Sequence, residues 1–237
     1  MRAFTFFIFF SISLFGFSQT YLEKVTNMVG VTYSPSVSFT IFQEEGPMYP
    51  VEISEKNPLP SLAEYYGTNL ARPESYINAL FGKVDALFQA SKDDYYVFLK
   101  VIGNNTNSKL GIVVRNGNFT KEEKYYLENL SFDSIKHYFR YGKFFQGANE
   151  KEAYELYQML NFYSKEKAKK MFNAEIMFSF PIDLHGNAYK ENYKRAKAVF
   201  FQNKGKAICL FFLMTDDNYW KVDTFLKDFE KVFSFNE

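Results

Sequence analysis

Apolar residues recur at helical spacing close to the C-terminus of the chain. The positions are separated by three or four residues, and they are Val222, Phe225, Leu226, Phe229, Val232 and Phe233. This spacing predicts one continuous amphipathic helix. Asp216 and Asp217 precede it and are candidates for its N-terminal cap. We expect Phe229 to be buried against the preceding strand, beside Phe211 and Leu213.

A β-hairpin is predicted immediately before this helix. Residues 198–202 and 207–214 are apolar runs separated by a polar turn at residues 203–206. The second run is apolar almost throughout, which is typical of a central strand that is covered on both faces. It contains Cys209, the only cysteine of the chain, which we therefore interpret as a small buried residue rather than a reactive thiol.

A similar pattern lies about one hundred residues earlier. Residues 95–102 and 110–115 have the composition of two strands joined by a polar turn at residues 103–108. Thr120 follows, with Glu123 three positions later, which is the spacing of a helix capping box. An extended segment precedes each unit, at residues 36–42 and 175–180. The order suggests an internal repeat of strand, hairpin and helix.

Helices and loops are expected between these units. Residues 46–60 hold four of the seven prolines and predict an irregular loop, followed by helices at residues 61–70 and 74–90. A further helical region is predicted at residues 150–172, opened by Asn149 with Glu152 three positions later. Its basic end, with four lysines between positions 165 and 170, is interpreted as a solvated face.

The boundary between halves is predicted at residues 142–149. We therefore expect an N-terminal unit of residues 19–141 and a C-terminal unit of residues 149–237, arranged as two domains or as one continuous domain. Locally paired strands with helices between them indicate an α+β fold, with antiparallel sheets covered by helices and two related strand–hairpin–helix units.

One family resemblance follows from this order of elements. The extended segment that ends in Phe180-Pro181, the hairpin and the closing helix that ends in Phe233-Ser234-Phe235 resemble the PsbP/Mog1-type α–β–α sandwich. The resemblance covers residues 172–237 and recurs at residues 30–135. It implies a largely non-catalytic binding or assembly protein, and it transfers no active-site residue.

The first eighteen residues have the pattern of a cleaved export signal. Arg2 supplies a positive charge, residues 3–15 are apolar, and the small residues Gly16 and Ser18 precede a cleavage point before Gln19. The apolar stretch is too short to stay in a bilayer, and no cysteine at the cleavage point could carry a lipid. We expect a signal peptide at residues 1–18 and a mature protein that is soluble, either secreted or periplasmic.

Composition changes this picture little. The chain of 237 residues has a formal net charge of +1, and loss of Arg2 with the signal brings it close to zero. Nucleic acid and an anionic membrane surface are therefore not expected partners. The 18 Tyr and 29 Phe are many, but Lys, Asn, Phe and Tyr all have A/T-rich codons. An A/T-rich bacterial genome accounts for this composition without selection for aromatic function.

Catalytic motifs are not found. His137 and His185 are the two histidines, and neither has a partner at a known motif spacing. Asp183, His185 and Glu191 fit no established metal-ligand pattern. The sequence has no nucleophile turn of the Gly-x-Ser-x-Gly type and no glycine-rich phosphate loop. We expect no cofactor, no metal and no catalytic role for either histidine or for Cys209, so the balance is against an enzyme.

Clustered aromatic residues beside basic ones are the remaining positive feature. They lie in the glycine-punctuated segment before the predicted boundary, and the candidate ligand-binding residues are Tyr138, Arg140, Tyr141 and Phe144. Tyrosine with arginine is the composition of interaction surfaces and of sugar-stacking platforms, although packing in a thick core is the competing interpretation. Because neighbouring residues of a strand face opposite sides, at least one of Tyr95 and Tyr96 is expected to point away from the main core.

Three functions remain open. The first is a non-enzymatic exported module that binds a protein partner or an envelope component. The second is a carbohydrate- or small-ligand-binding protein that uses exposed Tyr and Phe. The third is a carboxylate-based hydrolase, for which two suitably spaced carboxylates would be needed.

Overall fold

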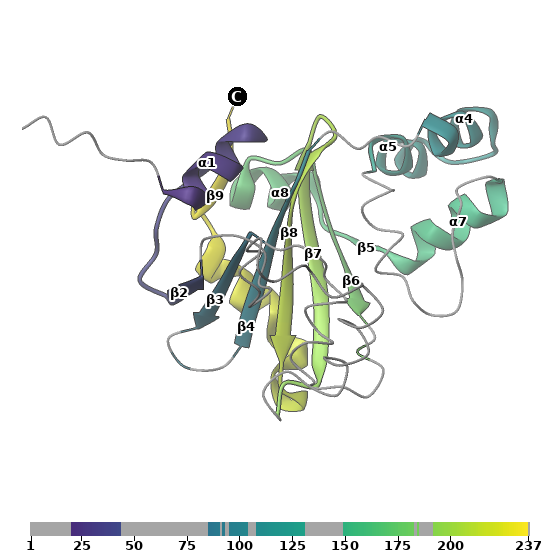
Figure 1. Ribbon diagram of the computed structural model, residues 1–237. Coiled ribbons are helices and arrows are strands. Elements are labelled where there is room, and N and C mark those ends of the chain that lie inside the picture. The colour runs from purple at the N-terminus through teal and green to yellow at the C-terminus, as the bar shows by residue number, and fades with distance from the viewer. Residues whose placement is uncertain are drawn as a thin grey trace, which may run out of the picture.

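An antiparallel sheet of seven strands is the centre of the computed structural model, which describes residues 20–43, 85–90, 92, 95–103, 108–130, 149–182, 184 and 192–236. The strand order is β2-β3-β4-β8-β7-β6-β5 (Figure 1). The bounds are Phe39–Gln43 for β2, Ala86–Ala90 for β3, Tyr95–Ile102 for β4, Asn161–Phe162 for β5, Ile176–Ile182 for β6, Arg195–Asn203 for β7 and Lys206–Met214 for β8. Every neighbouring pair in this order is antiparallel.

Strand β8 occupies the middle of the sheet. Its residues from Ala207 to Met214 are all buried and contribute alternately to a core on each face of the sheet. On one side it pairs with β7, and on the other with β4, where Tyr95 lies opposite Met214 and Ile102 opposite Ala207. Strands from both halves of the sequence therefore form one continuous sheet.

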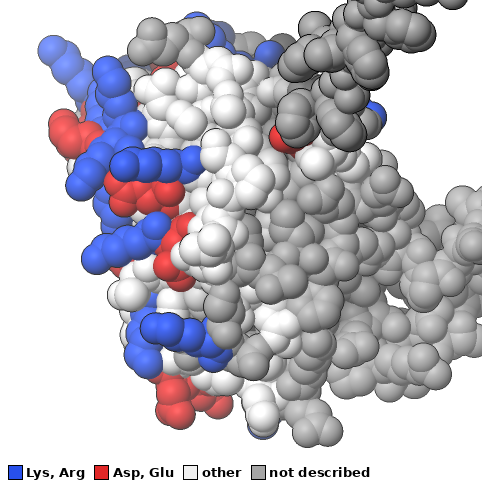
Figure 2. Space-filling model, turned by 90° about the vertical axis from the view of Figure 1, so that its left-hand side faces the viewer, with Lys and Arg blue, Asp and Glu red and all other residues white. Residues whose placement is uncertain are grey.

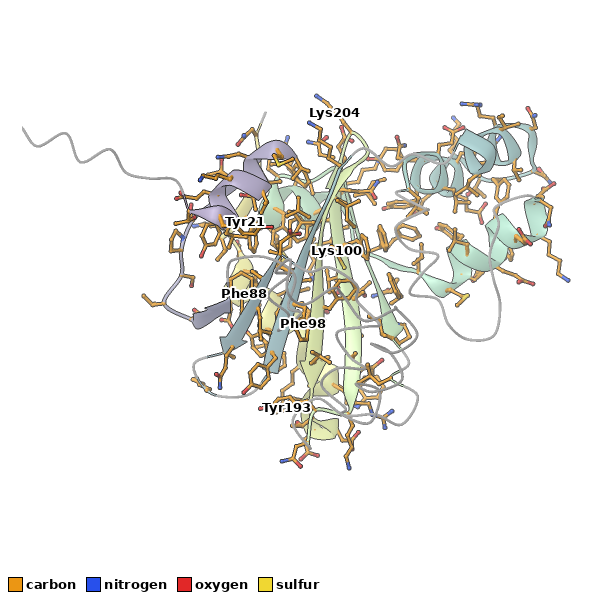
Figure 3. The ribbon with its side chains drawn as sticks, in the orientation of Figure 1. Tyr21, Phe88, Phe98, Lys100, Tyr193 and Lys204 are labelled. Atoms are coloured by element: carbon orange, nitrogen blue, oxygen red, sulfur yellow. The ribbon has the colours of Figure 1, made fainter. Side chains whose placement is uncertain are left out.

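The predicted hairpin is confirmed as β7 and β8. Its tight turn places Lys204 at φ 50° and Gly205 at φ 77°. Positive φ at two successive residues defines the turn that matches the right-handed twist of a hairpin, and Gly205 has no Cβ to oppose it. Figure 3 labels Lys204 at the tip of this hairpin.

On one face of the sheet, three helices pack beside the β5–β6 edge (Figure 1). They are α4 (Ser108–Asn116), α5 (Lys121–Asn129) and α7 (Glu150–Met159). Their apolar positions join those of the strands in one core, which includes Leu110, Val114, Leu127, Ala153, Leu156, Phe98, Phe178, Phe200 and Phe211. As the sequence predicts, Thr120 starts α5 with a capping box, and the Asn149 side chain caps the N-terminus of α7.

The opposite face is covered by both ends of the described chain. Helices α1 (Tyr21–Met28) and α8 (Lys165–Phe172) lie there with the C-terminal segment η1 (Asp216–Lys221), α9 (Val222–Phe225) and η2 (Leu226–Phe229). A separate two-stranded sheet pairs β1 (Val31–Tyr33) with β9 (Phe233–Phe235). The layers are thus helix, sheet and helix, which confirms the α+β class with an antiparallel sheet covered by helices.

One strand prediction is wrong, because residues 110–115 belong to helix α4. Leu110 and Val114, four residues apart, are buried in the core on the side where α4 packs against α5 and α7, whereas Ile112 is half exposed. The β-branched run favours a strand by propensity, but packing of this helical face decides the structure. Ser108, predicted to end a turn, is the first residue of the helix. Residues 95–102 and 110–115 therefore do not form the predicted hairpin, and β4 pairs instead with the strand that precedes it, β3, so the hairpin of the first half lies one strand earlier than predicted.

Two helix predictions are corrected in part. Residues 86–90, predicted to end a helix, form strand β3. The other predicted helical positions, from 61 to 84, and the predicted loop at residues 46–60 lie outside the described residues. The region 150–172 is helical but interrupted by β5. There Leu160 is extended at ψ 133°, and Ser164 starts α8 by accepting a hydrogen bond from the backbone N–H of Lys167.

The closing helix is shorter than predicted. Helical turns end at Phe229, Lys231 adopts φ 69°, and residues 233–235 are the strand β9. The prediction is wrong because Val232, Phe233 and Phe235 are buried like residues of an apolar helix face, although they belong to a turn and to strand β9. The cap prediction is also wrong, since Thr215 is at the N-cap and makes no side-chain capping bond.

Two aromatic placements also differ from expectation. Phe229 is fully buried, but its ring contacts Phe212 at 5.8 Å between centroids, whereas Phe211 and Leu213 belong to the core on the other face. Tyr95 and Tyr96 do face opposite sides of β4, yet both are buried, because each face of the sheet has its own core.

Candidate functional site

The residues proposed from sequence as a ligand site lie outside the described part of the chain. Tyr138, Arg140, Tyr141 and Phe144 all fall within residues 131–148. His137 and His185 are also outside it, as is the predicted signal peptide. These assignments stay predictions.

Cys209 is placed where the sequence predicts it. The residue is fully buried in β8, opposite Lys100 of β4. Burial raises the pKa of the Cys209 thiol well above its usual range, although the nearby Lys100 opposes this effect. Burial lowers the pKa of Lys100 in turn. A thiol that is buried and protonated is not a nucleophile, so the interpretation of Cys209 as a core residue is confirmed.

Metal-binding side chains do not converge in the described residues. No group of three or more His, Cys, Asp or Glu with a suitable arrangement occurs among them.

None of the helices in the described part of the chain has the length and apolar character needed to span a membrane.

Trp220 is the most conspicuous exposed aromatic residue that the structure describes. Its side chain is 82% exposed, and it lies in η1, the turn of 3-10 helix that directly follows the central strand β8. The indole contacts the ring of Tyr219 edge-on, with 5.0 Å between centroids and an interplanar angle of 78°. This edge-to-face geometry is a favourable one for two aromatic rings.

Two basic side chains of β7 contact the ring of Tyr219. The Lys197 ammonium lies 4.9 Å from the centre of the Tyr219 ring, and the Arg195 guanidinium lies 6.0 Å from it, both within cation–π range. Arg195 Nε also donates to Asp216 Oδ1 at 2.6 Å. We call Arg195, Lys197, Asp216, Tyr219 and Trp220 the Trp220 corner.

Burial makes the inner part of this corner distinct from the outer part. Lys197 is half-buried, and desolvation lowers its pKa while the charge of Asp223 opposes the change. Desolvation also raises the pKa of Tyr219, with Arg195 opposing it. Trp220, Arg195 and Asp216 are exposed, whereas Tyr219 and Lys197 are partly buried, so the corner consists of a partly buried Tyr219–Lys197 base with an exposed ion pair and an exposed indole around it.

The corner is at the end of the sheet opposite the β7–β8 turn. Strand β8 runs from the turn at Lys204 toward η1, and Arg195 begins β7 opposite Met214. Tyr193, labelled at this end in Figure 3, packs edge-on against Tyr96 at 4.9 Å between centroids. The corner therefore lies at the ends of β7 and of the central strand β8.

A groove of about 320 Å³ borders the same C-terminal segment. Its walls come from α8 and from α9 with the residues that follow it, and the lining residues are Lys167, Lys170, Met171, Asp223, Thr224, Lys227 and Glu230. We call it the α8–α9 groove. Lys167 Nζ lies 3.3 Å from Asp223 Oδ1 and 4.3 Å from the centre of the Tyr163 ring, so this lysine is held in place.

Figure 2 shows positive and negative side chains next to one another along the left of the view. No extended patch of a single sign occurs among the coloured atoms of that view. This distribution agrees with the near-neutral composition, and it does not favour a polyanion such as nucleic acid.

Comparison with known proteins gives little. No protein-family model and no curated protein matches the sequence. Among solved structures, the chain is similar to the solution structure of cyanobacterial PsbP (CyanoP) from Synechocystis sp. PCC 6803. The identity is 9%, the match covers 87% of each chain, and the TM-score is 0.32. This similarity is a weak one at the level of fold, and it does not establish a shared family.

Sequence reasoning missed Trp220. A signal was present, because Trp220 is the only tryptophan of the chain and its single codon, unlike those of Lys, Asn, Phe and Tyr, is not A/T-rich. The compositional explanation for the other aromatic residues therefore does not extend to this one.

Proposed function

We propose that the protein is an exported, non-enzymatic module that binds a protein partner of the cell envelope through the Trp220 corner. The observation that carries the proposal is the 82% exposure of Trp220 above a base fixed by Tyr219, Arg195 and Lys197. Tryptophan, tyrosine and arginine are the residue types most enriched at the energetic centres of protein interfaces.

The energy available from this side chain is sufficient for such a role. Burying a tryptophan removes about 150–250 Å² from water, which at about 25 cal/mol per Å² corresponds to a gross gain of about 3–5 kcal/mol for an indole exposed to this extent. The conformational entropy lost on binding reduces this figure. A residue is nevertheless called a hot spot when its replacement by alanine costs about 2 kcal/mol of binding free energy or more.

The corner is also organised before binding. The exposed Arg195–Asp216 contact at 2.6 Å and the cation–π contacts of Arg195 and Lys197 with the partly buried Tyr219 connect the turn that carries the indole to β7. A fixed anchor loses less conformational entropy on binding than a mobile one, which raises affinity without new contacts.

Affinity capture from envelope extracts tests the proposal. The immobilised mature protein should retain a protein partner that Trp220→Ala loses, with at least a tenfold weaker Kd on re-binding of the purified partner. Tyr154→Ala is the matched control, because Tyr154 is 50% exposed on α7, far from the corner. Equal retention by Trp220→Ala and by the wild type would contradict the proposal.

Folding of the variant is checked separately. Because Trp220 is so exposed, Trp220→Ala should change the free energy of unfolding by less than about 0.5 kcal/mol. A loss of binding with unchanged stability then reports on the surface itself.

Carbohydrate binding is the second candidate, and the edge-to-face Tyr219–Trp220 pair favours it. Sugars stack on exposed aromatic faces of this kind. Because Trp220 is the only tryptophan, its intrinsic fluorescence reports on this corner alone. Saturable quenching or a blue shift with envelope oligosaccharides, together with no protein captured, would favour the carbohydrate over the protein partner.

A further inference from the structure

We propose that the α8–α9 groove binds an acidic segment of the same partner polypeptide whose apolar side chain contacts Trp220. This inference rests on the proposed function and specifies the chemistry of the partner.

The exposed side of the C-terminal segment connects the two places. Between residues 216 and 229, Val222, Phe225, Leu226 and Phe229 are buried. Trp220, Thr224 and Lys227 are exposed and are spaced four and three residues apart, so they follow one side of the helical turns. Thr224 and Lys227 line the groove, and Trp220 precedes them by one turn.

Charge in the groove favours an acidic occupant. Of its five charged residues, Lys167 and Asp223 already pair at 3.3 Å. Lys170 and Lys227 then face Glu230 alone, so the remainder carries one net positive charge. A carboxylate placed between the two exposed ammonium groups would accept charge-assisted hydrogen bonds from both walls.

An apolar surface accompanies this charge. Met171 is only 6% exposed and lines the groove together with Thr224. A thioether adapts its shape to different neighbours, so small apolar side chains next to the acidic residue can be accommodated. The volume of about 320 Å³ suits a few side chains of a peptide.

Geometry sets the spacing that the partner needs. Trp220 and Lys227 are seven residues apart in a segment that rises about 1.5–2.0 Å per residue, which gives a separation of roughly 10–14 Å. An extended peptide advances about 3.3 Å per residue. The acidic residue should therefore lie three or four positions from the apolar residue that contacts Trp220.

A random-peptide display library selected on the folded mature protein tests this spacing. We expect enrichment of Asp or Glu three or four positions from an aromatic or large aliphatic residue. The peptide selected most strongly is then synthesised, and its Kd is measured by Trp220 fluorescence and by calorimetry.

Lys170→Glu is the informative variant, and Lys169→Glu is its matched control. Both residues are exposed in the last turn of α8, and both changes alter net charge and the helix dipole equally, but only Lys170 lines the groove. We expect the Kd to rise at least tenfold for Lys170→Glu and less than twofold for Lys169→Glu. A rise in salt from 50 to 500 mM should weaken wild-type binding more than that of Lys170→Glu.

The outcomes separate the two proposals. Peptides that need Trp220 but lack acidic residues, or that bind Lys170→Glu normally, would overturn the groove inference and leave the proposed function standing. Peptides that need Lys170 but bind Trp220→Ala normally would contradict the proposed function. Equal losses for Lys170→Glu and Lys169→Glu would show a general charge effect and overturn the inference, as would competition by free acetate or phosphate at millimolar concentration.

Discussion

Replacement of Phe229 by alanine removes a ring from the centre of the second core. The side chain is fully buried, and its ring contacts aromatic rings from four strands, β3, β4, β8 and β9. Its ring meets Phe88 of β3 and Phe212 of β8 edge-on, each with 5.8 Å between centroids, and it stacks on Phe233 of β9 at 6.3 Å.

The size of the effect follows from how poorly this site can close. Phe-to-Ala changes in cores cost about 3–5 kcal/mol, and less when neighbours move in to fill the space. Here the neighbouring rings Phe88 and Phe212 come from strands that are hydrogen-bonded into the sheet on both sides. They cannot shift without breaking strand pairing, so we expect a loss in the upper half of that range, about 4–5 kcal/mol.

Urea denaturation followed by far-UV circular dichroism measures this loss directly. For a domain of this size the same change should lower Tm by about 8–20 °C. Lys227→Ala, on the exposed side of the same segment, should cost less than about 0.5 kcal/mol. A loss below about 1.5 kcal/mol for Phe229→Ala, or equal losses for the two variants, would refute the assignment of Phe229 to a closed core.

Three further predictions concern the hairpin, the buried thiol and the N-terminus. Gly205→Val should destabilise the protein by about 1–2 kcal/mol because φ 77° is strained for a branched residue, whereas Lys204→Asn should be neutral or slightly stabilising in the same urea assay. Cys209 has a raised pKa in the folded state, so stability should fall as pH rises above the unfolded thiol pKa of about 8.5. Cys209→Ala should remove about 1 kcal/mol of that loss between pH 7 and 9.5, and parallel pH profiles for the two proteins would contradict the assignment. N-terminal sequencing of exported protein should begin near Gln19, and detection of intact Met1 would exclude cleavage.

Local chemistry explains which elements the sequence predicts well. The β7–β8 turn is specified by Gly205 and its polar neighbours, and the starts of α5 and α7 are specified by Thr120 and Asn149, whose side chains accept hydrogen bonds from the backbone three residues later. These interactions form within a few residues, so a pattern of residue types is enough to locate them.

Elements that depend on distant contacts are predicted poorly. The run that contains Leu110 and Val114 has strand composition but becomes α4, because helices α5 and α7 provide a surface for one helical face. Phe233 and Phe235 continue a helical spacing but pair with β1, which lies about two hundred residues earlier. Apolar spacing reports that a residue is buried, and short stretches do not distinguish the element that buries it.

The candidate site was missed for a related reason. Exposure of Trp220 depends on η1 being a turn that packs Tyr219 inward and leaves its neighbour outside. A dipeptide of two aromatic residues does not show which ring is buried. Tyr95 and Tyr96 illustrate the opposite outcome, since a sheet with a core on each face buries both.

The position of the Trp220 corner ties its function to the stability of the sheet. Its basic residues Arg195 and Lys197 belong to β7, and its aromatic residues follow directly from β8, so strand register fixes their relative positions. A one-residue slip between these strands would turn Lys197 to the other face and separate it from Tyr219. Because β8 is apolar at nearly every position, alternation of apolar and polar residues does not specify its register. The tight turn at Gly205 therefore fixes the register for both the core and the corner.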